Sequence, residues 1–92
     1  MKVENMESSK GNKVANQFRI EDVENETEYF QSYNSIIVKR EYKGNTYLDE
    51  KYWDYSRTTA KYRNIFLNET KKETQAKINN GTYKLVDLNG GN

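Results

Sequence analysis

The scarcity of apolar side chains limits this sequence more than any other feature. Only 34% of its 92 residues are hydrophobic, and eight of those are tyrosines, which carry a polar hydroxyl. A domain of this length lies near the size at which burial of a core just offsets the loss of chain entropy. We therefore expect one small domain with a thin core, in which tyrosines form part of the core and of its rim.

Two residue types that carry much of enzyme chemistry are missing. The chain contains no cysteine and no histidine, which excludes disulfides, thiolate metal sites, a cysteine nucleophile and serine–histidine catalysis within one chain. The carboxylates considered for metal or acid–base chemistry do not form a pattern typical of a site: they are Glu41, Asp49, Glu50 and Asp54. We expect no enzyme activity, no catalytic residue, no metal and no cofactor.

Hydropathy indicates no membrane segment. No apolar run approaches the roughly 20 residues that a membrane helix needs, and the N-terminus lacks the apolar core of a signal peptide. We expect a soluble, cytoplasmic protein that does not contact a membrane.

The charged residues are distributed unevenly. Residues 1–28 contain four Lys or Arg against seven Asp or Glu, a net charge of −3, whereas residues 29–92 contain eleven against seven, a net charge of +4. Apolar residues are scattered in the first segment, which is typical of a weakly structured chain. The sequence predicts a flexible acidic leader at 1–28, one α+β domain at 29–89 and a frayed tail at 90–92.

Alternating apolar residues predict a hairpin at the start of the domain. Residues 29–42 carry the strongest strand signal, with Ile36, Val38 and Tyr42 on one face. Gly44-Asn45 fits a two-residue type II′ turn with positive φ at Gly44. That turn would place Tyr42 opposite Tyr47.

Capping signals predict two helices after the hairpin. Asp54 or Ser56 can cap a helix that runs to about Leu67, and Thr70-Lys71-Lys72-Glu73 is a capping box that opens a second helix. Gly81 is suited to the left-handed residue that ends this helix. A strand follows at 82–88.

These elements predict an α+β fold with the order β-β-α-α-β. We expect a small three-stranded antiparallel sheet packed against a helical pair, with the last strand beside the hairpin. The flexible acidic leader would precede this domain.

Aromatic and basic residues indicate a binding surface. Tyr, Trp and Arg dominate the energetics of protein interfaces, and a domain with 13% aromatic residues and a thin core is expected to expose some of them. The candidate partner-binding residues are Tyr33, Tyr55, Arg57, Lys61 and Arg63.

Nucleic-acid binding is the alternative for the same helices. The short connection between them allows a helix-turn-helix arrangement, in which Arg57, Lys61 and Arg63 would contact phosphates. The eight tyrosines also allow base stacking on an exposed sheet. The residues that would line the recognition helix are Lys71, Lys72, Gln75 and Asn79.

Several short strings carry a resemblance to known sequences. They are Phe30-x-Ser32-Tyr33-Asn34, Leu48-Asp49, Trp53-Asp54-Tyr55-Ser56-x-Thr58-Thr59-x-Lys61-Tyr62-Arg63-x-x-Phe66-Leu67 and Gly81-x-Tyr83-x-Leu85. Over residues 29–89 the chain resembles a family of small uncharacterised proteins carried by phages, prophages and plasmids of low-GC Gram-positive bacteria. By analogy with other small phage proteins, the resemblance implies an accessory protein of the anti-CRISPR type.

The leading hypothesis is a mobile-element protein that binds a host protein or ribonucleoprotein complex stoichiometrically in the bacterial cytoplasm. It would inhibit a host defence nuclease complex through the helix at 55–63, with the acidic leader as a second contact. The alternative is a small DNA-binding regulator or replication accessory protein. A third hypothesis is a self-assembling structural phage component, which predicts a homo-oligomer.

Overall fold

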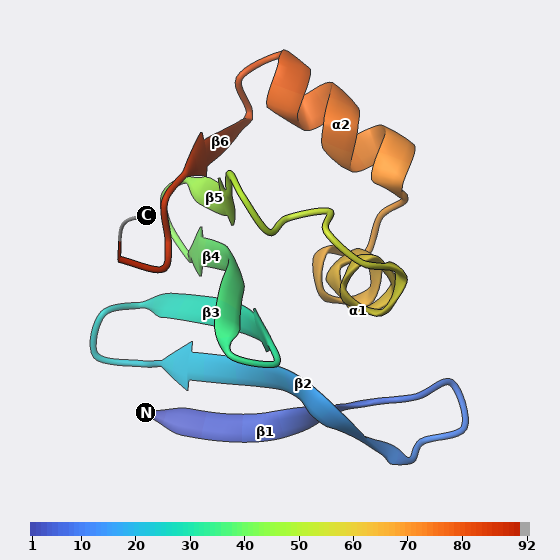
Figure 1. The fold of residues 1–92 in the computed structure, drawn as a ribbon. Coiled ribbons are helices and arrows are strands. Elements are labelled where there is room, and N and C mark those ends of the chain that lie inside the picture. The colour runs from blue at the N-terminus through green and yellow to red at the C-terminus, as the bar shows by residue number, and fades with distance from the viewer. Residues whose placement is uncertain (91–92) are drawn as a thin grey trace.

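The computed structural model describes residues 1–90 and has an α+β fold with one mixed sheet and two helices (Figure 1). The described elements are, in chain order, β1 (Lys2–Glu7), β2 (Lys13–Asp22), β3 (Thr27–Ser32), β4 (Ser35–Glu41), β5 (Thr46–Asp49), α1 (Arg57–Leu67), α2 (Lys71–Asn79) and β6 (Tyr83–Val86).

The strands follow one another across the sheet in sequence order, β1-β2-β3-β4-β5-β6. Strands β1 to β5 form an antiparallel meander, and β6 pairs with β5 in the parallel direction. A parallel neighbour needs a long crossover, which α1 and α2 provide. The prediction of a three-stranded antiparallel sheet was therefore wrong. The last strand does lie beside the hairpin, as expected, but it runs parallel to its neighbour β5.

The segment at 1–28 is part of the sheet, so the expectation of a flexible leader was also wrong. It contributes β1 and β2 and the first residues of β3. Met6 of β1 reaches the core, where it is buried. The domain thus begins at the first strand, and a single buried apolar side chain in β1 is too weak a signal to reveal this from the sequence.

The hairpin of β4 and β5 is confirmed, but its register differs from the prediction. Val38 pairs with Leu48 and Lys39 with Tyr47, so Tyr42 lies in the connecting loop and is 48% exposed. The loop spans residues 42–45 and not two residues, and within it the Glu41 side chain accepts a hydrogen bond from the Asn45 amide at 3.0 Å. Gly44 does not adopt the positive φ that a type II′ turn needs.

A bulge in β4 changes which side chains are buried. The pairing between β3 and β4 shifts between Phe30 and Gln31, which leaves Ile37 as an extra residue. As a result Ile37 and Val38, although adjacent in the chain, are both fully buried.

The helix boundaries agree with the predicted caps. Ser56 caps α1 through a hydrogen bond from the Thr59 amide, and Thr70 and Glu73 form the reciprocal capping box of α2. Gly81 has a φ of +85° after the end of α2. Asn68 supplies the left-handed residue that ends α1.

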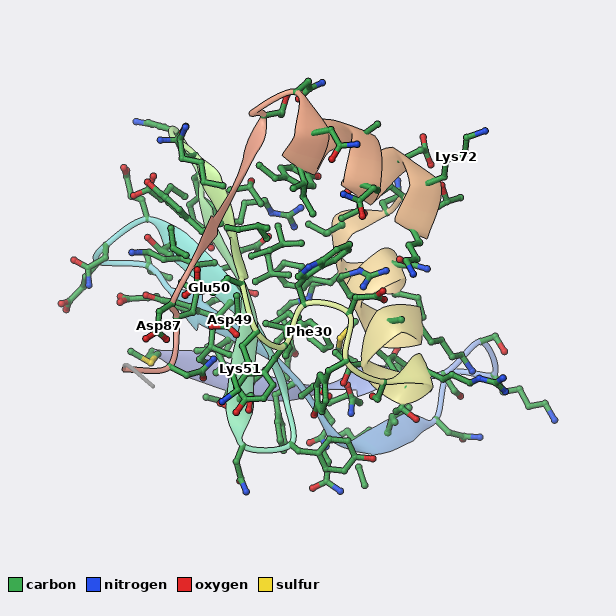
Figure 2. All side chains as sticks on the ribbon, turned by 45° about the horizontal axis from the view of Figure 1, so that its top comes forward. Phe30, Asp49, Glu50, Lys51, Lys72 and Asp87 are labelled. Carbon is green, nitrogen blue, oxygen red and sulfur yellow. The ribbon has the colours of Figure 1, made fainter. Side chains whose placement is uncertain are left out.

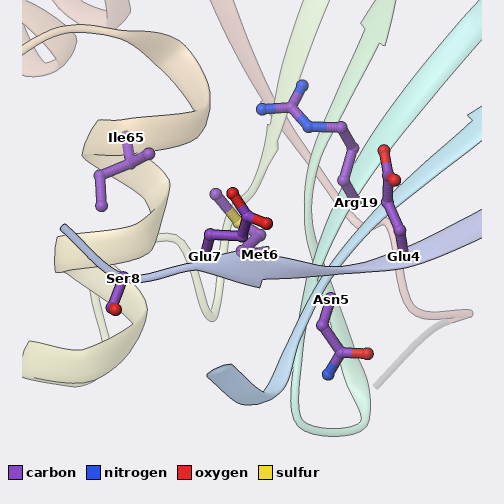
Figure 3. Close-up of a pocket in the computed structure, with 7 residues that line it drawn as sticks. All are labelled: Glu4, Asn5, Met6, Glu7, Ser8, Arg19 and Ile65. Carbon is purple, nitrogen blue, oxygen red and sulfur yellow. The ribbon is translucent and has the colours of Figure 1, made fainter. Parts of the chain in front are cut away.

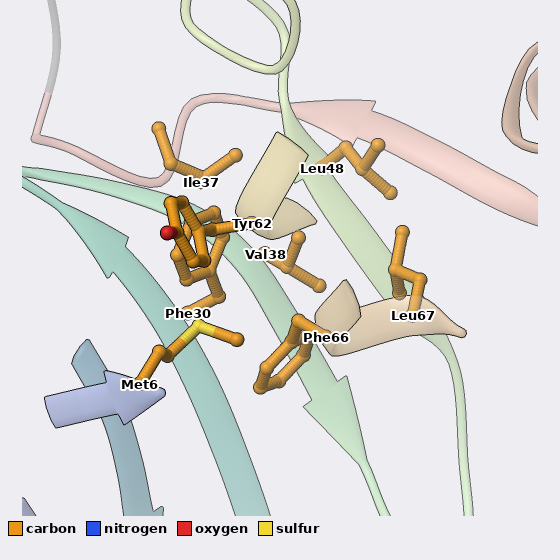
Figure 4. Close-up of a cluster of buried hydrophobic side chains, with 8 residues drawn as sticks. All are labelled: Met6, Phe30, Ile37, Val38, Leu48, Tyr62, Phe66 and Leu67. Carbon is orange, nitrogen blue, oxygen red and sulfur yellow. The ribbon is translucent and has the colours of Figure 1, made fainter. Parts of the chain in front are cut away.

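The core lies between α1 and the inner face of the sheet, the face that the helices cover (Figure 4). Phe30 of β3 stacks on Phe66 of α1 with ring centroids 5.8 Å apart. The buried hydrophobic residues are Met6, Phe30, Ile37, Val38, Leu48, Tyr62, Phe66 and Leu67.

Two arginines close one side of this core. The guanidinium groups of Arg19 and Arg40 lie 4.6 Å and 4.7 Å from the Phe66 ring centroid. Both arginines form ion pairs with Glu28, so their charges are compensated where they contact the ring.

Both helices lie on the same side of the sheet, and its outer face carries no helix (Figure 1). The frayed tail expected at 90–92 falls largely outside the described residues. Within residues 1–90, neither helix has the length and apolar character needed to cross a membrane.

Substitution of Met6 tests whether β1 belongs to the folded domain. Met6→Ala removes a side chain that is 5% exposed and should lower the free energy of unfolding by about 2 kcal/mol or more. Val3→Ala, at a position 59% exposed in the same strand, should change it by less than about 0.5 kcal/mol. Urea denaturation measures both, and equal, negligible effects would contradict the placement of β1.

Candidate functional site

The surface around the start of α1 contains four of the five predicted partner-binding residues. We call it the docking patch and define it as Tyr33, Tyr55, Arg57 and Lys61. These residues come from the β3–β4 turn, the loop before α1 and α1 itself.

A buried hydrogen bond connects the parts of the docking patch. The hydroxyl groups of Ser32 and Thr59 are 2.7 Å apart, and both residues are fully buried. This contact attaches the end of β3 to the first turn of α1. Because Tyr33 directly follows Ser32, it lies at the same end of the molecule as the N-terminus of the helix.

The two tyrosines of the docking patch are held in place but remain accessible. Tyr33 adopts a φ of 55° and donates its amide hydrogen to the Asn16 carbonyl at 2.7 Å. Tyr55 packs edge-on against Tyr52, with ring centroids 5.3 Å apart. Tyr33 and Tyr55 are 46% and 45% exposed.

Arg63, the fifth predicted residue, does not belong to a surface. Its side chain is 0% exposed and donates hydrogen bonds to the Trp53 carbonyl at 2.6 Å, to Asp54 Oδ1 at 3.1 Å and to Asn64 Oδ1 at 2.9 Å. The guanidinium carbon also lies 5.1 Å from the centroid of the Trp53 ring. Arg63 lies on the buried face of α1, so its role is structural.

Asp54 connects the two helices. It forms ion pairs with Arg63 at 3.1 Å and with Lys71 of α2 at 2.7 Å. Burial by itself raises the pKa of Asp54, but the hydrogen bonds from Lys71 and Arg63 outweigh this effect, and the pKa is lowered from its ordinary value. Of the two residues predicted as possible caps of α1, Ser56 is the cap, and Asp54 instead pairs with two cations.

The four predicted nucleic-acid-binding residues share one outer face of α2. Lys71, Lys72, Gln75 and Asn79 line an open, shallow groove together with Ala76, and Lys72 extends from the outer surface of the helix (Figure 2). Three of these four side chains already have partners within the domain. Lys71 pairs with Asp54, and the Gln75 amide donates to Asn79 Oδ1 at 3.0 Å.

A polar cluster attaches the inner side of α2 to the rest of the domain. Glu69 accepts hydrogen bonds from Thr74 at 2.8 Å and from Lys77 at 2.6 Å. Its side chain is almost fully buried. The Tyr83 ring of β6 lies 5.3 Å from the Nζ atom of the same Lys77. This cluster fixes the orientation in which α2 presents its outer face.

A second depression was not foreseen from the sequence. It has a volume of about 450 Å³ and lies between β1, β2 and α1 (Figure 3). Its lining residues are Glu4, Asn5, Met6, Glu7, Ser8, Arg19 and Ile65. The strands that form it were expected to be flexible, so no sequence pattern pointed to it.

The acidic residues do not converge on a metal site. Asp49 is buried and accepts hydrogen bonds from the backbone amides of Lys51, Tyr52 and Leu88, which gives it a structural role. Among residues 1–90, no three residues of the types His, Cys, Asp and Glu are grouped so that they could hold a metal ion.

The amino-acid sequence matches the model of one protein family. A family model, described as a family of unknown function (DUF8033), matches residues 1–80. The chain belongs to this family. The matched range includes residues 1–28, in agreement with their place in the sheet. No curated protein and no solved structure matches the chain.

Substitution of Arg63 in this DUF8033 protein tests its structural role. Arg63→Ala leaves a cavity and the unpaired carbonyl of Trp53, and should lower the free energy of unfolding by about 3 kcal/mol or more. Arg57→Ala removes an exposed arginine of the same helix and should change it by less than about 0.5 kcal/mol. Urea denaturation measures the free energy of unfolding of both variants. A value for Arg63→Ala close to that of the unaltered protein would contradict the structural role of Arg63.

Acid should destabilise the DUF8033 fold partly through Glu69. Burial alone raises the pKa of Glu69, but hydrogen bonds from Lys77, Tyr83 and Thr74 outweigh it, so the pKa falls below the ordinary 4.5. A lowered folded-state pKa stabilises the fold above the unfolded-state value, and this contribution is lost as pH falls through the folded-state value.

The corresponding measurement is the thermal midpoint between about pH 6 and pH 2. Glu69→Gln should have a lower midpoint at neutral pH and a shallower decline in acid than the unaltered protein. Parallel pH profiles for the two proteins would show that Glu69 does not contribute to the acid response.

Proposed function

We propose that this protein acts by stoichiometric binding, and that the docking patch contacts an acidic surface of a protein or ribonucleoprotein complex. The observation that carries the proposal is the buried Ser32–Thr59 hydrogen bond. It attaches the turn that carries Tyr33 to the first turn of the helix that carries Arg57 and Lys61, so less loop entropy is lost on binding.

The chemistry of the docking patch supports an acidic partner. Arg57 and Lys61 are exposed, and neither forms an ion pair with another residue in the described part of the chain. Lys61 Nζ lies 5.4 Å from the centroid of the Tyr62 ring, a contact that leaves its charge uncompensated by any described carboxylate. Tyrosine and arginine are also the residue types that most often dominate binding energy at protein interfaces.

The target class follows from the resemblance described above and stays a prediction. A defence nuclease complex of a bacterial host fits the proposal if it offers an acidic surface next to a functional groove. A flexible acidic leader is not part of this proposal, because Lys2–Glu7 and Lys13–Asp22 are two strands of the sheet.

Charge reversal at the docking patch tests the proposal. The double variant Arg57→Glu/Lys61→Glu should reduce capture of the partner from a bacterial lysate at least about tenfold, because each reversal replaces attraction by repulsion. Arg63 is left unchanged because its reversal would unfold the domain. The pull-down is run after nuclease treatment and quantified by mass spectrometry.

The control carries the same change of charge elsewhere. Lys10→Glu/Lys13→Glu alters two exposed lysines near the β1–β2 turn and should capture the partner as well as the unaltered protein. A partner that is retained equally by both double variants would show that the docking patch is not the interface.

Duplex DNA binding through α2 is the second candidate. It is favoured by the common outer face of Lys71, Lys72, Gln75 and Asn79. Binding of this kind would disappear from the pull-down after nuclease treatment, and it would weaken steeply and log-linearly with salt.

A further inference from the structure

The outer face of the sheet carries an unbroken row of side chains across all six strands. The pairing register places Val3 beside Ile20, Ile20 beside Tyr29, Tyr29 beside Lys39, Lys39 beside Tyr47, and Tyr47 beside Lys84. We call these six residues the outer row.

Contacts of the neighbouring residues establish that this row faces away from the helices. Side chains alternate between the two faces of a strand. Arg19 directly precedes Ile20, and Arg40 directly follows Lys39. Both arginines contact Phe66 of α1, so they point to the helix side of the sheet. In β6, the Tyr83 ring lies 5.3 Å from Lys77 Nζ of α2. The outer row therefore occupies the face that has no helix (Figure 1).

The outer row alternates aromatic rings and cations over its second half. From β3 to β6 the order is Tyr29, Lys39, Tyr47, Lys84, and Lys39 Nζ lies 5.7 Å from the centroid of the Tyr47 ring. The row contains no carboxylate. Within residues 1–90, neither lysine forms an ion pair.

We propose that the outer row is a binding site for single-stranded nucleic acid. Neighbouring strands lie about 4.8 Å apart, so Tyr29 and Tyr47 are about 10 Å apart with Lys39 between them. One base can stack on each ring while the phosphate that links them lies near Lys39, and Lys84 can contact the next phosphate. Phe18 and Gln31, paired on the same face, extend the surface by another ring and an amide.

The same residues argue against the other occupants. A duplex keeps its bases stacked on each other, so the tyrosine rings would have no base faces to contact. A second copy stacked face to face would bring Lys39 and Lys84 into a dry interface without carboxylates in the row, which is costly. A single strand supplies both the phosphates and the exposed base faces. This site is separate from the docking patch and does not depend on the proposed function.

Fluorescence anisotropy with labelled oligothymidylate and oligouridylate of about twelve nucleotides tests the site. Tyr47→Ala should weaken binding between about 5-fold and 150-fold, the range expected for loss of one base stack. Tyr47→Phe keeps the ring and should stay within about twofold. Tyr55→Ala, an exposed tyrosine of the docking patch, should leave the affinity unchanged.

The salt dependence of the affinity is an independent measurement. It reports contacts between lysines and phosphates, and a tyrosine with only a structural role would not change it. Two phosphate contacts predict a slope of log affinity against log salt of about −1.4 for a single strand, and Lys84→Ala should reduce its magnitude by about 0.7. Circular dichroism and thermal unfolding confirm that each variant is folded. Lys39→Glu/Lys84→Glu alters only surface charge and should abolish binding.

Four results would overturn the inference. The first is no binding of either single strand by the unaltered protein, and the second is binding retained by Lys39→Glu/Lys84→Glu. The third is loss of binding in Lys71→Glu/Lys72→Glu while Tyr47→Ala binds with unchanged affinity, which would show that the strand binds at α2. The fourth is a dimer in light scattering that Tyr47→Ala converts to a monomer, because a second copy would then cover the face.

Discussion

The buried guanidinium of Arg63 is the interaction on which the arrangement of the helices depends. It binds the loop after β5 through the Trp53 carbonyl and Asp54, and Asp54 in turn pairs with Lys71 of α2. Arg63 and Asp54 together therefore connect the β5–α1 loop, α1 and α2. A buried cation of this kind is tolerated only when its partners are in place, so the pair of Arg63 and Asp54 favours one arrangement of the two helices.

The small number of apolar residues explains the one-sided sheet. The buried hydrophobic residues are enough to pack α1 against the inner face, where Phe30 meets Phe66 (Figure 4). Among residues 1–90 no helix covers the other face, which has tyrosines and lysines instead. An aromatic ring with a polar hydroxyl can remain at such a surface because it is partly shielded by its sheet neighbours and still reaches water.

Local signals in the sequence were reliable where the interactions are local. The capping box at Thr70, the cap at Ser56 and the glycine at Gly81 involve residues within one turn of each other, and all were predicted. The register of β4 and β5 was not predicted, although the contact between Glu41 and Asn45 in their loop is also local. Strand β1 was missed because its burial depends on pairing with β2, and both strands lie in the segment that was expected to be flexible.

The sequence by itself determined the helix ends, the presence of the hairpin and the residue types available for binding. Only the tertiary structure decided where those residues lie. It buried Arg63, brought Tyr33 to the start of α1 and aligned Tyr29, Lys39 and Tyr47 across three strands. The reason is physical: caps and turns are set by neighbours along the chain, whereas burial and register are set by contacts between distant segments, which a pattern of single residues does not encode.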